Sequence, residues 1–325
     1  MRTILITGGA GFIGSHLIDF LLEKGEQVIC VDNFDTYYDP SKKRINISPH
    51  IGKPNFVLIE EDICDRISLE KKLSDLTFEV IVHIAARAGV RPSITNPEIY
   101  ERVNISGTLN MLEIARQRNI KKFIFASSSS VYGTNQKVPW SEDDNVLRPI
   151  SPYAATKVAG ELLGYTYSHL YGIQFIALRF FTVYGPRQRP DLAIHKFAKM
   201  LIEGKPIVLY GNGSTQRDYT YIDDIIQGLY ASIEYNDSIY EVINLGNNSP
   251  ISLTGLVDII EKVFDTKIVR HYDNLPPGDV PQTYADISKA YALLNYTPQT
   301  TLEEGIRKFK DWFLASQPNQ ADEEV

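Results

Sequence analysis

The chain has 325 residues, of which 43% are hydrophobic and 22% charged, and its formal net charge is −7. This composition is that of an ordinary globular protein with room for one large domain, or for a domain and a smaller lobe. The negative charge argues against a general nucleic-acid surface, and no apolar run approaches the roughly 20 residues that span a bilayer.

Strands and helices are expected to alternate in the first half of the chain. The expected strands are Thr3–Thr7, Gln27–Asp32, Phe56–Glu60, Val80–Ile84, Lys122–Ala126 and Gln174–Arg179. The expected helices are Phe12–Glu23, Pro97–Gln117 and Pro152–Tyr171. Near-continuous apolar strands separated by helices predict a parallel sheet that is covered on both faces. The fold class expected is therefore α/β, with a Rossmann-type doubly wound sheet.

The pattern changes after about residue 180. Prolines at 186, 190 and 206 and the loop Gly211–Thr215 interrupt the alternation, and shorter elements follow. We therefore expect a Rossmann domain over residues 1–180 and a smaller C-terminal α/β lobe over residues 181–316. Some later segments are expected to return to the main sheet. The polar, acidic tail 317–325 is expected to be flexible.

A glycine-rich turn follows the first expected strand. Thr7–Ser15 reads TGGAGFIGS, in which Gly8, Gly11 and Gly14 have G-x-x-G-x-x-G spacing. Glycines let the backbone approach a pyrophosphate, and the helix that follows offers amide donors and a positive dipole. Asp32 ends the next strand, where a carboxylate can accept both adenosine ribose hydroxyls and repel a 2′-phosphate. The βαβ context predicts a site for NAD rather than NADP.

A weaker signal follows the third expected strand. Asp62 and Ile63 stand at its end and are candidates for a contact with adenine. An acid at this place is as often a helix N-cap, so both interpretations stay open.

Tyr153 and Lys157 are the candidates for chemistry. They lie four residues apart in SPYAATKVAGE, hence on one face of a helix. A phenol with a pKa of about 10 is a poor base, but a nearby ammonium and a positive nicotinamide ring would favour the phenolate. An ordinary Tyr/Lys pair on an amphipathic helix is the alternative. The four serines Ser127–Ser130 at the preceding strand end make the catalytic interpretation more specific.

Several motifs occur in one order over about residues 1–290: TGGAGFIGS, Asp32, HIAARAGVRPS, SSSSVYG, YAATK, RFFTVYGPRQRPD, QRDYTYIDD and PPGDVPQTYAD. In these the chain resembles the extended short-chain dehydrogenase/reductases of the NAD-dependent nucleotide-sugar epimerase/dehydratase group. The resemblance implies that Ser128 bonds the sugar O4, that Tyr153 is the general base and that Lys157 is its electrostatic partner. The NAD site expected from the motifs and the resemblance comprises Gly8, Gly11, Phe12, Ile13, Gly14, Asp32, Asn33, Asp62, Ile63, Ala85, Ala86, Asn104, Ser127, Tyr153, Lys157 and Phe180.

The serine run bears on the reaction. Ser129 and Ser130 stand where dehydratases of this group carry an Asp-Glu pair, which removes the C5 proton and protonates the leaving hydroxyl. UDP-glucuronate decarboxylases tend to place a glutamate at the position of Ser130. An unactivated serine scarcely titrates near neutral pH. We therefore expect an isomerase, in which a transient 4-keto sugar is reduced again with inversion at C4.

The sugar is suggested by departures from galactose-type 4-epimerases. Thr182 stands where those enzymes usually have Asn, and Pro276 where they have Arg. Arg187 and Arg189 in VYGPRQRPD, together with AGVRPS, are similar to UDP-glucuronate 4-epimerases. Hydroxyls and a bidentate arginine suit a sugar carboxylate, and we favour Arg189 over Arg187 for this contact. The expected reaction is UDP-glucuronate to UDP-galacturonate.

The nucleotide end is expected to use the C-terminal lobe. Arg217 and Asp279 match the group's diphosphate and ribose contacts. Tyr210 can stack on uracil, although an aromatic at a strand end is as often core. The expected substrate contacts are Ser128, Ser129, Thr182, Arg189, Tyr210, Arg217 and Asp279.

Alternatives to this reaction stay open. One is a UDP-glucose or UDP-N-acetylglucosamine 4-epimerase, or a UDP-glucuronate decarboxylase, on the same scaffold. A different class is an NAD-binding sensor without catalysis. The intact set Ser128, Tyr153 and Lys157 speaks against the sensor, because a sensor needs no general base.

Location and partners follow from the same sequence. The N-terminus lacks a signal-peptide core, so we expect a cytoplasmic protein without nucleic-acid or membrane partners. Cys30 and Cys64 have no metal-like spacing and fit a reducing compartment, and we expect no metal site. The resemblance implies a homodimer through the helices Pro97–Gln117 and Pro152–Tyr171.

Overall fold

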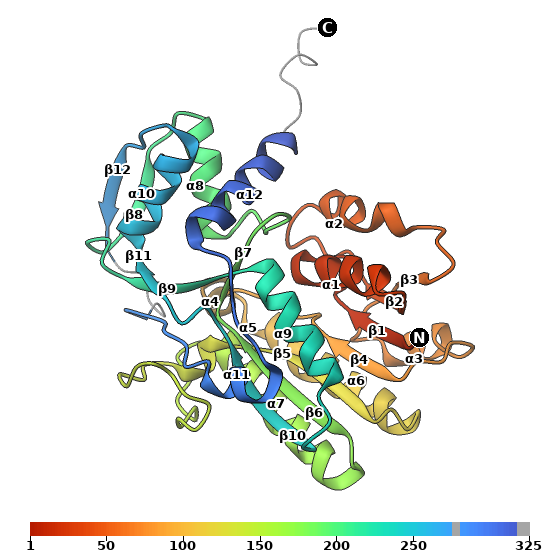
Figure 1. Ribbon diagram of the computed structural model, residues 1–325. Helices are drawn as coiled ribbons and strands as arrows, with labels where there is room; N and C mark the ends of the chain where they lie inside the picture. Colours follow the sequence, from red (N-terminus) through yellow and green to blue (C-terminus); the bar gives the residue numbers. More distant parts are fainter. Residues whose placement is uncertain (275–279, 317–325) are drawn as a thin grey trace, which may run out of the picture.

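A parallel sheet of seven strands runs through the molecule (Figure 1). The computed structural model describes residues 1–274 and 280–316. The strand order is β10-β6-β5-β4-β1-β2-β3, and the pairings are parallel. The strands are β1 (Thr3–Thr7), β2 (Gln27–Asp32), β3 (Phe56–Glu60), β4 (Val80–His83), β5 (Lys122–Ser128), β6 (Gln174–Phe180) and β10 (Tyr240–Leu245). The predicted α/β, doubly wound class is confirmed.

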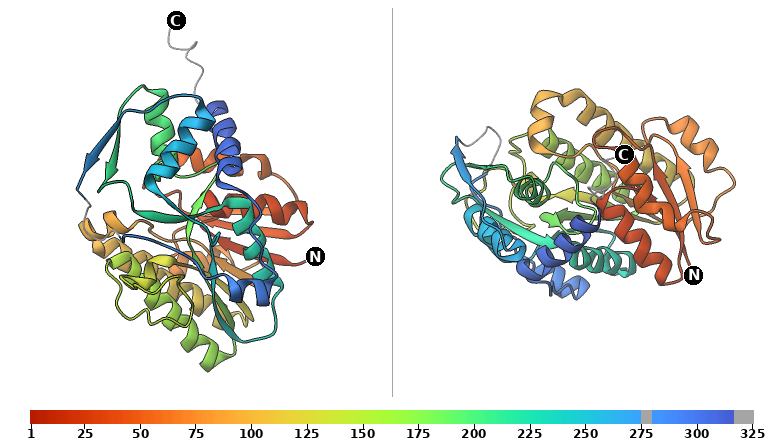
Figure 2. Two further views of the ribbon diagram at one scale, coloured as in Figure 1. Left: turned by 60° about the vertical axis from the view of Figure 1, so that its left-hand side comes forward. Right: turned by 90° about the horizontal axis from the view of Figure 1, so that it is seen from above.

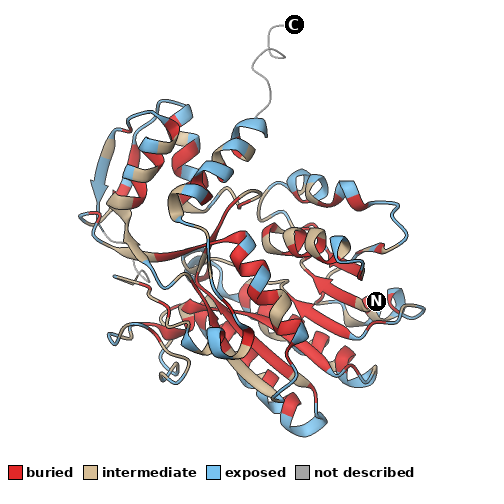
Figure 3. Ribbon diagram, in the orientation of Figure 1, coloured by how far each residue is buried: buried red, intermediate tan, exposed pale blue. Residues whose placement is uncertain are grey.

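The strands are apolar on both sides because helices cover both sides. In β1, Ile4 and Ile6 belong to one buried cluster and Leu5, between them, to the other. All three side chains are fully buried, and Figure 3 shows the central strands as buried along their length. Continuous apolar runs are what a parallel sheet with two covered faces requires.

Helices pack on the sheet in two layers. On the Ile4 face lie α1 (Phe12–Glu23) and α9 (Ile222–Glu234), and on the Leu5 face lie α3 (Arg66–Lys72), α6 (Gly107–Gln117) and α7 (Pro152–Tyr171). The other helices are α2 (Pro40–Ile47), α4 (Val90–Thr95), α5 (Pro97–Tyr100), α8 (Ala193–Ile202), α10 (Leu253–Phe264), α11 (Ser288–Leu294) and α12 (Leu302–Ala315). Among the described residues, no helix has the length and apolarity needed to cross a bilayer.

The helix predicted as one piece over Pro97–Gln117 is interrupted. Between α5 and α6 the backbone forms a π-helical turn, Glu101–Ser106. Within it, the Asn104 side chain accepts a hydrogen bond from the Arg87 backbone N–H at 2.7 Å and donates one to the Arg87 carbonyl at 3.0 Å. Turns of this kind often occur at functional sites. Here the turn faces the loop that follows β4.

Two small sheets lie above the main sheet (Figures 1 and 2). One consists of β7 (Thr182–Tyr184), β9 (Gln216–Tyr221) and β11 (Pro250–Ser252), and the other of β8 (Ile207–Tyr210) and β12 (Arg270–Asp273). Helices α8, α10 and α12 pack with them. Between these segments the chain returns to the main layer as α9 and β10. The domain boundary at residue 180 stays a prediction.

Candidate functional site

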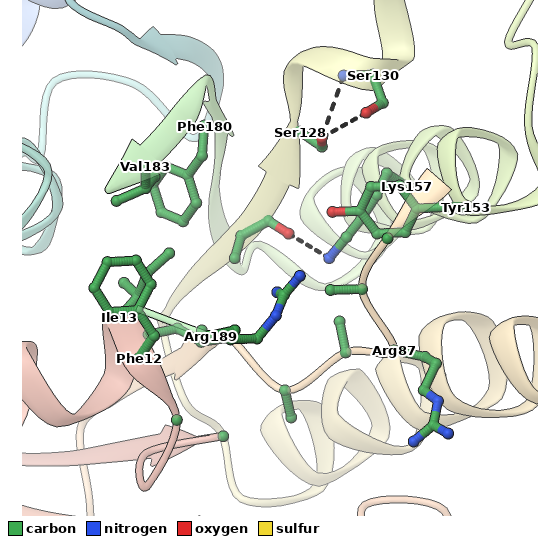
Figure 4. A pocket seen from close by; sticks show the side chains of 18 of the residues that line it. Phe12, Ile13, Arg87, Ser128, Ser130, Tyr153, Lys157, Phe180, Val183 and Arg189 are labelled. Atoms are coloured by element: carbon green, nitrogen blue, oxygen red, sulfur yellow. Dashed lines mark hydrogen bonds between the residues drawn. The ribbon is translucent and has the colours of Figure 1, made fainter. Parts of the chain in front are cut away.

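A cavity of about 480 Å³ opens at the carboxyl ends of the main strands (Figure 4). The strand order reverses between β1 and β4, and open α/β sheets bind ligands at such a switch point. Most of the predicted site residues line this one cavity: Gly8, Gly11, Phe12, Ile13, Asp32, Asn33, Asp62, Ile63, Ala85, Ala86, Ser127, Ser128, Ser129, Tyr153, Lys157, Phe180, Thr182, Arg189 and Arg217.

The glycine turn brings bare backbone to the cavity wall. Gly8 has a φ of +68°, and a Cβ added to it would lie 2.8 Å from Ala85 Cα in the loop after β4. A Cβ on Gly14 would lie 2.4 Å from the Gly8 carbonyl oxygen. Gly14 therefore lets α1 pack against the turn but does not itself line the cavity. Because these glycines carry no side chain, the backbone at the N-terminus of α1 is left uncovered, as the binding of a pyrophosphate requires.

Asp32 is fixed by the backbone around it. Its carboxylate accepts hydrogen bonds from the N–H groups of Ala10 at 3.1 Å and Phe34 at 2.9 Å, and burial raises its pKa. Nearby on the cavity wall, the Tyr38 hydroxyl is buried with no hydrogen-bond partner among the described residues. Lys43 adds a positive charge to the same wall. An oriented carboxylate and an unpartnered hydroxyl fit an adenosine ribose.

Asp62 makes local turn contacts and lines the cavity, but it is not the N-cap of α3, which is Asp65. It accepts hydrogen bonds from the Cys64 backbone N–H at 2.8 Å and the Asn33 side chain at 3.2 Å, which are turn contacts. Asp62 and Ile63 nevertheless line the cavity beside Asp32. Their contact with adenine stays a prediction.

The loop after β4 rests on buried polar groups. His83 bonds Thr7 Oγ1 at 2.7 Å through Nδ1 and Thr108 Oγ1 at 3.0 Å through Nε2. Thr108 Oγ1 donates to the Asn104 carbonyl, so it accepts from His83, which places the imidazole proton on Nε2. Thr7 Oγ1 then accepts from the Ala85 N–H at 3.2 Å. Burial lowers the pKa of His83 to about 3, so this clamp is neutral.

Asn104 lies behind the cavity rather than on its wall. Besides holding Arg87, its side chain donates to Thr156 Oγ1 on α7 at 3.0 Å. It therefore ties the loop after β4 to the helix that carries Tyr153. The side chain is buried and does not line the cavity, and its contact with a cofactor stays a prediction.

Ser128, Tyr153 and Lys157 come together from two elements. Ser128 ends β5, and the other two lie on α7, which is N-capped by a bond from the Ala154 N–H to Ser151 Oγ at 3.1 Å. The Ser128 side chain acts to lower the pKa of Tyr153. The Lys157 ammonium donates to the Ala126 carbonyl at 2.6 Å and lies 5.9 Å from the Tyr153 ring centroid.

Burial dominates the electrostatics of this group. It raises the pKa of Tyr153, against the opposing effects of the Ser128 hydroxyl and the Arg189 charge. It lowers the pKa of Lys157 to about 7, although Glu161 one turn further along α7 acts in the opposite direction. The expectation that a neighbouring ammonium favours the phenolate is therefore not met by the protein's own groups. The low-dielectric surroundings, which the sequence does not display, outweigh it.

The two arginines of the VYGPRQRPD segment have different places. Arg189 lines the cavity, and Figure 4 shows its guanidinium extended toward the centre, near Lys157 and Tyr153. Arg187 does not line it and pairs with Asp19 at 2.7 Å. The choice of Arg189 over Arg187 for a ligand contact is thus consistent with the geometry.

The nucleotide end is described in part. Arg217 and Thr182 line the cavity. Tyr210 does not; its ring lies under the Arg91 guanidinium, with 4.4 Å between the Arg91 Cζ atom and the ring centroid. Asp279 lies outside the described residues.

Sequence reasoning missed several cavity residues. Tyr37, Tyr38 and Lys43 follow Asp32 in the loop and helix after β2, and Arg87 follows β4. The tyrosine pair directly after the acidic strand end was the available signal. The described part of the chain holds no group of three or more His, Cys, Asp or Glu side chains suited to a metal ion.

Comparison with known proteins identifies the class. The profile of the family described as GDP-mannose 4,6 dehydratase matches residues 5–309, and the chain belongs to this family, within the extended short-chain dehydrogenase/reductases. A UDP-glucuronate 4-epimerase of Thermodesulfobacterium geofontis is 44% identical over 313 residues, covering 96% of each chain.

Solved structures agree. The UDP-glucuronic acid 4-epimerase of Bacillus cereus, in complex with UDP-glucuronic acid and NAD, is 39% identical with a TM-score of 0.91, covering 96% of this chain and 99% of that one. The UDP-glucose 4-epimerase of Thermotoga maritima with UDP-glucose is 32% identical with a TM-score of 0.89, covering 97% and 99%. The resemblance expected from the motifs is confirmed.

Proposed function

We propose that this protein is an NAD-dependent isomerase that inverts C4 of UDP-glucuronate to form UDP-galacturonate. The observation that carries the proposal is Arg189, whose guanidinium enters the cavity beside Tyr153. A guanidinium there offers charge-assisted hydrogen bonds to a carboxylate on the neighbouring sugar carbon. Support comes from two relatives named as UDP-glucuronate 4-epimerases, which are 44% and 39% identical to this chain.

NAD fits the cofactor end of the cavity. Gly8 and Gly11 would hold its pyrophosphate against the α1 N-terminus, and Asp32 and Tyr38 its adenosine ribose. When bound, NAD supplies a hydride acceptor and a positively charged ring. Asp32 also disfavours a 2′-phosphate, which makes NAD the expected cofactor.

The protein's own groups handle the proton. Ser128 orients the sugar O4 toward Tyr153, whose phenolate takes the O4 proton to become a phenol and later gives a proton back. Because burial alone raises the pKa of Tyr153, the phenolate depends on positive charge in the assembled site. Lys157 contributes part of that charge when protonated.

The serines that follow β5 do not supply the acid and base that elimination of water from the sugar requires. Ser130 donates its backbone N–H to Ser128 Oγ at 3.2 Å, and Ser128 donates its hydroxyl to Ser130 at 3.1 Å. Ser130 therefore supports Ser128 where a dehydratase would hold an acid. Because Ser129 and Ser130, rather than acids, follow Ser128 in the described structure, no carboxylate at these two positions removes the C5 proton, and the 4-keto sugar is reduced again on its other face.

Loss of carbon dioxide is the competing reaction. A 4-keto glucuronate is a β-keto acid, and its carboxylate leaves when the C5–C6 bond lines up with the ketone π-system. A carboxylate held by Arg189, with Thr182 and Ser129 on the same wall, stays out of that alignment.

Assembly and location complete the proposal. Leu109 on α6 and Leu162 and Tyr165 on α7 are exposed apolar side chains. We propose that these two helices form a four-helix interface in a cytoplasmic homodimer. Light scattering should report twice the chain mass, and Leu162→Lys should shift it toward the monomer.

The test is turnover of UDP-glucuronate that carries deuterium at C4. We expect UDP-galacturonate with the label retained at C4 and no net consumption of NAD. A pentose product would identify a decarboxylase, and no reaction a sensor. Turnover of UDP-glucose or UDP-N-acetylglucosamine alone would make it another 4-epimerase. Loss of the label to solvent would overturn the mechanism.

A further inference from the structure

Arg189 is held from one side by a carboxylate. Its Nε and one terminal nitrogen donate to the two oxygens of Asp191, each at 2.9 Å. This bidentate pair uses one edge of the guanidinium and leaves the edge formed by the two terminal nitrogens without another partner among the described residues. Figure 4 shows the guanidinium extended into the cavity. Asp191 itself does not line the cavity.

Tyr37 supports the same pair from a different part of the chain. Its hydroxyl donates to Asp191 at 3.5 Å, and its ring centroid lies 5.6 Å from the Arg189 Cζ atom. Arg87 lies over the same ring at 4.7 Å and is paired with Asp35. Two arginine–aspartate pairs therefore flank one aromatic ring.

The position of Tyr37 is itself fixed. Its backbone N–H donates to Asp35 Oδ1 at 2.7 Å. Its hydroxyl occupies space next to Gly89, where an added Cβ would approach the hydroxyl oxygen to 2.9 Å. Gly89 has a φ of +105°, which L side chains rarely adopt, so a larger residue is disfavoured there twice over. The loops after β2 and β4 thus determine where Asp191 and Arg189 lie.

We propose that Asp191, supported by Tyr37, is a positioning residue that fixes Arg189 so that a substrate carboxylate is received in one orientation, and thereby limits decarboxylation. This inference rests on the proposed function. The negative charge of the Asp191 carboxylate offsets the positive charge of Arg189. The Arg189 guanidinium therefore selects an anion by its geometry more than by its charge. Complementary pairs of this kind mainly provide specificity and register.

The reaction that Asp191 limits is the decarboxylation of the 4-keto intermediate. In the 4-keto intermediate the C5–C6 bond breaks and its electron pair forms the enolate of the C4 ketone. Carbon dioxide leaves, and C5 then takes a proton from solvent. The oxidation state of the cofactor does not change in this step. The product is a UDP-pentose once the ketone is reduced.

The experiment compares Asp191→Asn with Asp19→Asn. Asp19 pairs with Arg187 at 2.7 Å, two residues before Arg189, but neither residue lines the cavity. Each variant is incubated with UDP-glucuronate, and UDP-pentose and UDP-galacturonate are separated and measured. Their ratio does not depend on how much of the protein is folded. A merely structural role would therefore leave it unchanged.

We expect Asp191→Asn to raise the pentose ratio about tenfold and to lower kcat/KM for epimerisation about tenfold, because small misplacements of a positioning group are costly. For Asp19→Asn, both the pentose ratio and kcat/KM should stay within about twofold of the wild-type values. Tyr37→Phe keeps the ring and loses the bond to Asp191, so a shift of about threefold in the same direction is expected.

The outcomes separate the two proposals. A wild-type protein that does not epimerise UDP-glucuronate overturns the proposed function, and this inference with it. A wild-type protein that epimerises, with Asp191→Asn and Tyr37→Phe both giving its product ratio, overturns the positioning role alone. An equal rise in Asp19→Asn would also overturn it, because the effect would then not be specific to Arg189.

Discussion

The two ends of the cavity are built by different means. The cofactor end consists of backbone: the Gly8 turn, the α1 N-terminus and Asp32 fixed by two main-chain N–H groups. The sugar end consists of side chains from different elements: Tyr153 and Lys157 on helix α7 and Arg189 on the loop between β7 and α8, all strongly affected by burial. The first end follows from the βαβ fold, whereas the second depends on how α7 and the distant loop that carries Arg189 meet. Substitutions at the sugar end should therefore change the choice of substrate without changing the affinity for NAD.

Tyr153→Phe should separate the two ends most strongly. Removing the phenol hydroxyl takes away the general base, so kcat with UDP-glucuronate should fall about 10³-fold. NAD affinity, measured by calorimetry, should stay within about twofold. Residual activity near a tenth of the wild type would mean that another group moves the proton.

Arg189→Ala tests the sugar end alone. Loss of a charge-assisted contact worth about 1.5–3 kcal/mol should lower kcat/KM for UDP-glucuronate roughly 10- to 100-fold. UDP-glucose, which has no carboxylate, should lose less than about threefold if it is turned over. Arg187→Ala is the matched control, since that side chain pairs with Asp19 outside the cavity. Equal losses on both substrates would contradict the assignment.

Gly14→Ala tests the cofactor end. The new Cβ would lie 2.4 Å from the Gly8 carbonyl oxygen, so the turn must shift, at a cost of about 1–3 kcal/mol. NAD binding should weaken about tenfold or more in a titration. Gly25→Ala is the control: Gly25 has a φ of +80° but no neighbour within 4 Å. That variant should lose about 1 kcal/mol of stability and keep its NAD affinity.

Lys157→Met should change the stability of the folded protein only slightly, and the change should be an increase in stability. The folded-state pKa of Lys157 is about 7, far below the unfolded value of about 10.4. Between these values the unfolded chain binds more protons, so the stability of the ligand-free protein rises with pH and is lost as pH falls toward 7.

Removing the ammonium should therefore flatten this pH dependence. At about pH 7 we expect Lys157→Met to be roughly 1 kcal/mol more stable than the wild type in urea unfolding, and inactive. Equal pH slopes between about pH 7 and pH 10 would show that Lys157 is not desolvated as described.

Elements with strong local signals were predictable. The sequence places β1, β2, α1 and α7 at their observed bounds. For α7 the reason is explicit: Ser151 caps its start, Pro152 occupies the first turn, and Gly172 ends it with a left-handed φ of +64°. The break at Glu101–Ser106 was not predictable, because the partner of Asn104 is Arg87, 17 residues away.

The site was predictable where it depends on strand ends. Since carboxyl ends of parallel strands share one edge, Gly8, Asp32 and Ser128 had to meet there. The roles of Asp191 and Tyr37 could not be read from the sequence, because 154 positions separate them. The raised pKa of Tyr153 was also hidden, because burial is a property of the assembled fold.

The late return of β10 has a consequence for synthesis on the ribosome. β10 pairs with β6, with Tyr240 opposite Phe175, so a nascent chain released only to residue 180 holds the complete glycine turn but exposes the backbone of β6. Open apolar edges invite pairing between chains. A fragment that stops near residue 180 should therefore aggregate, whereas one extended through Leu245 carries its own edge strand.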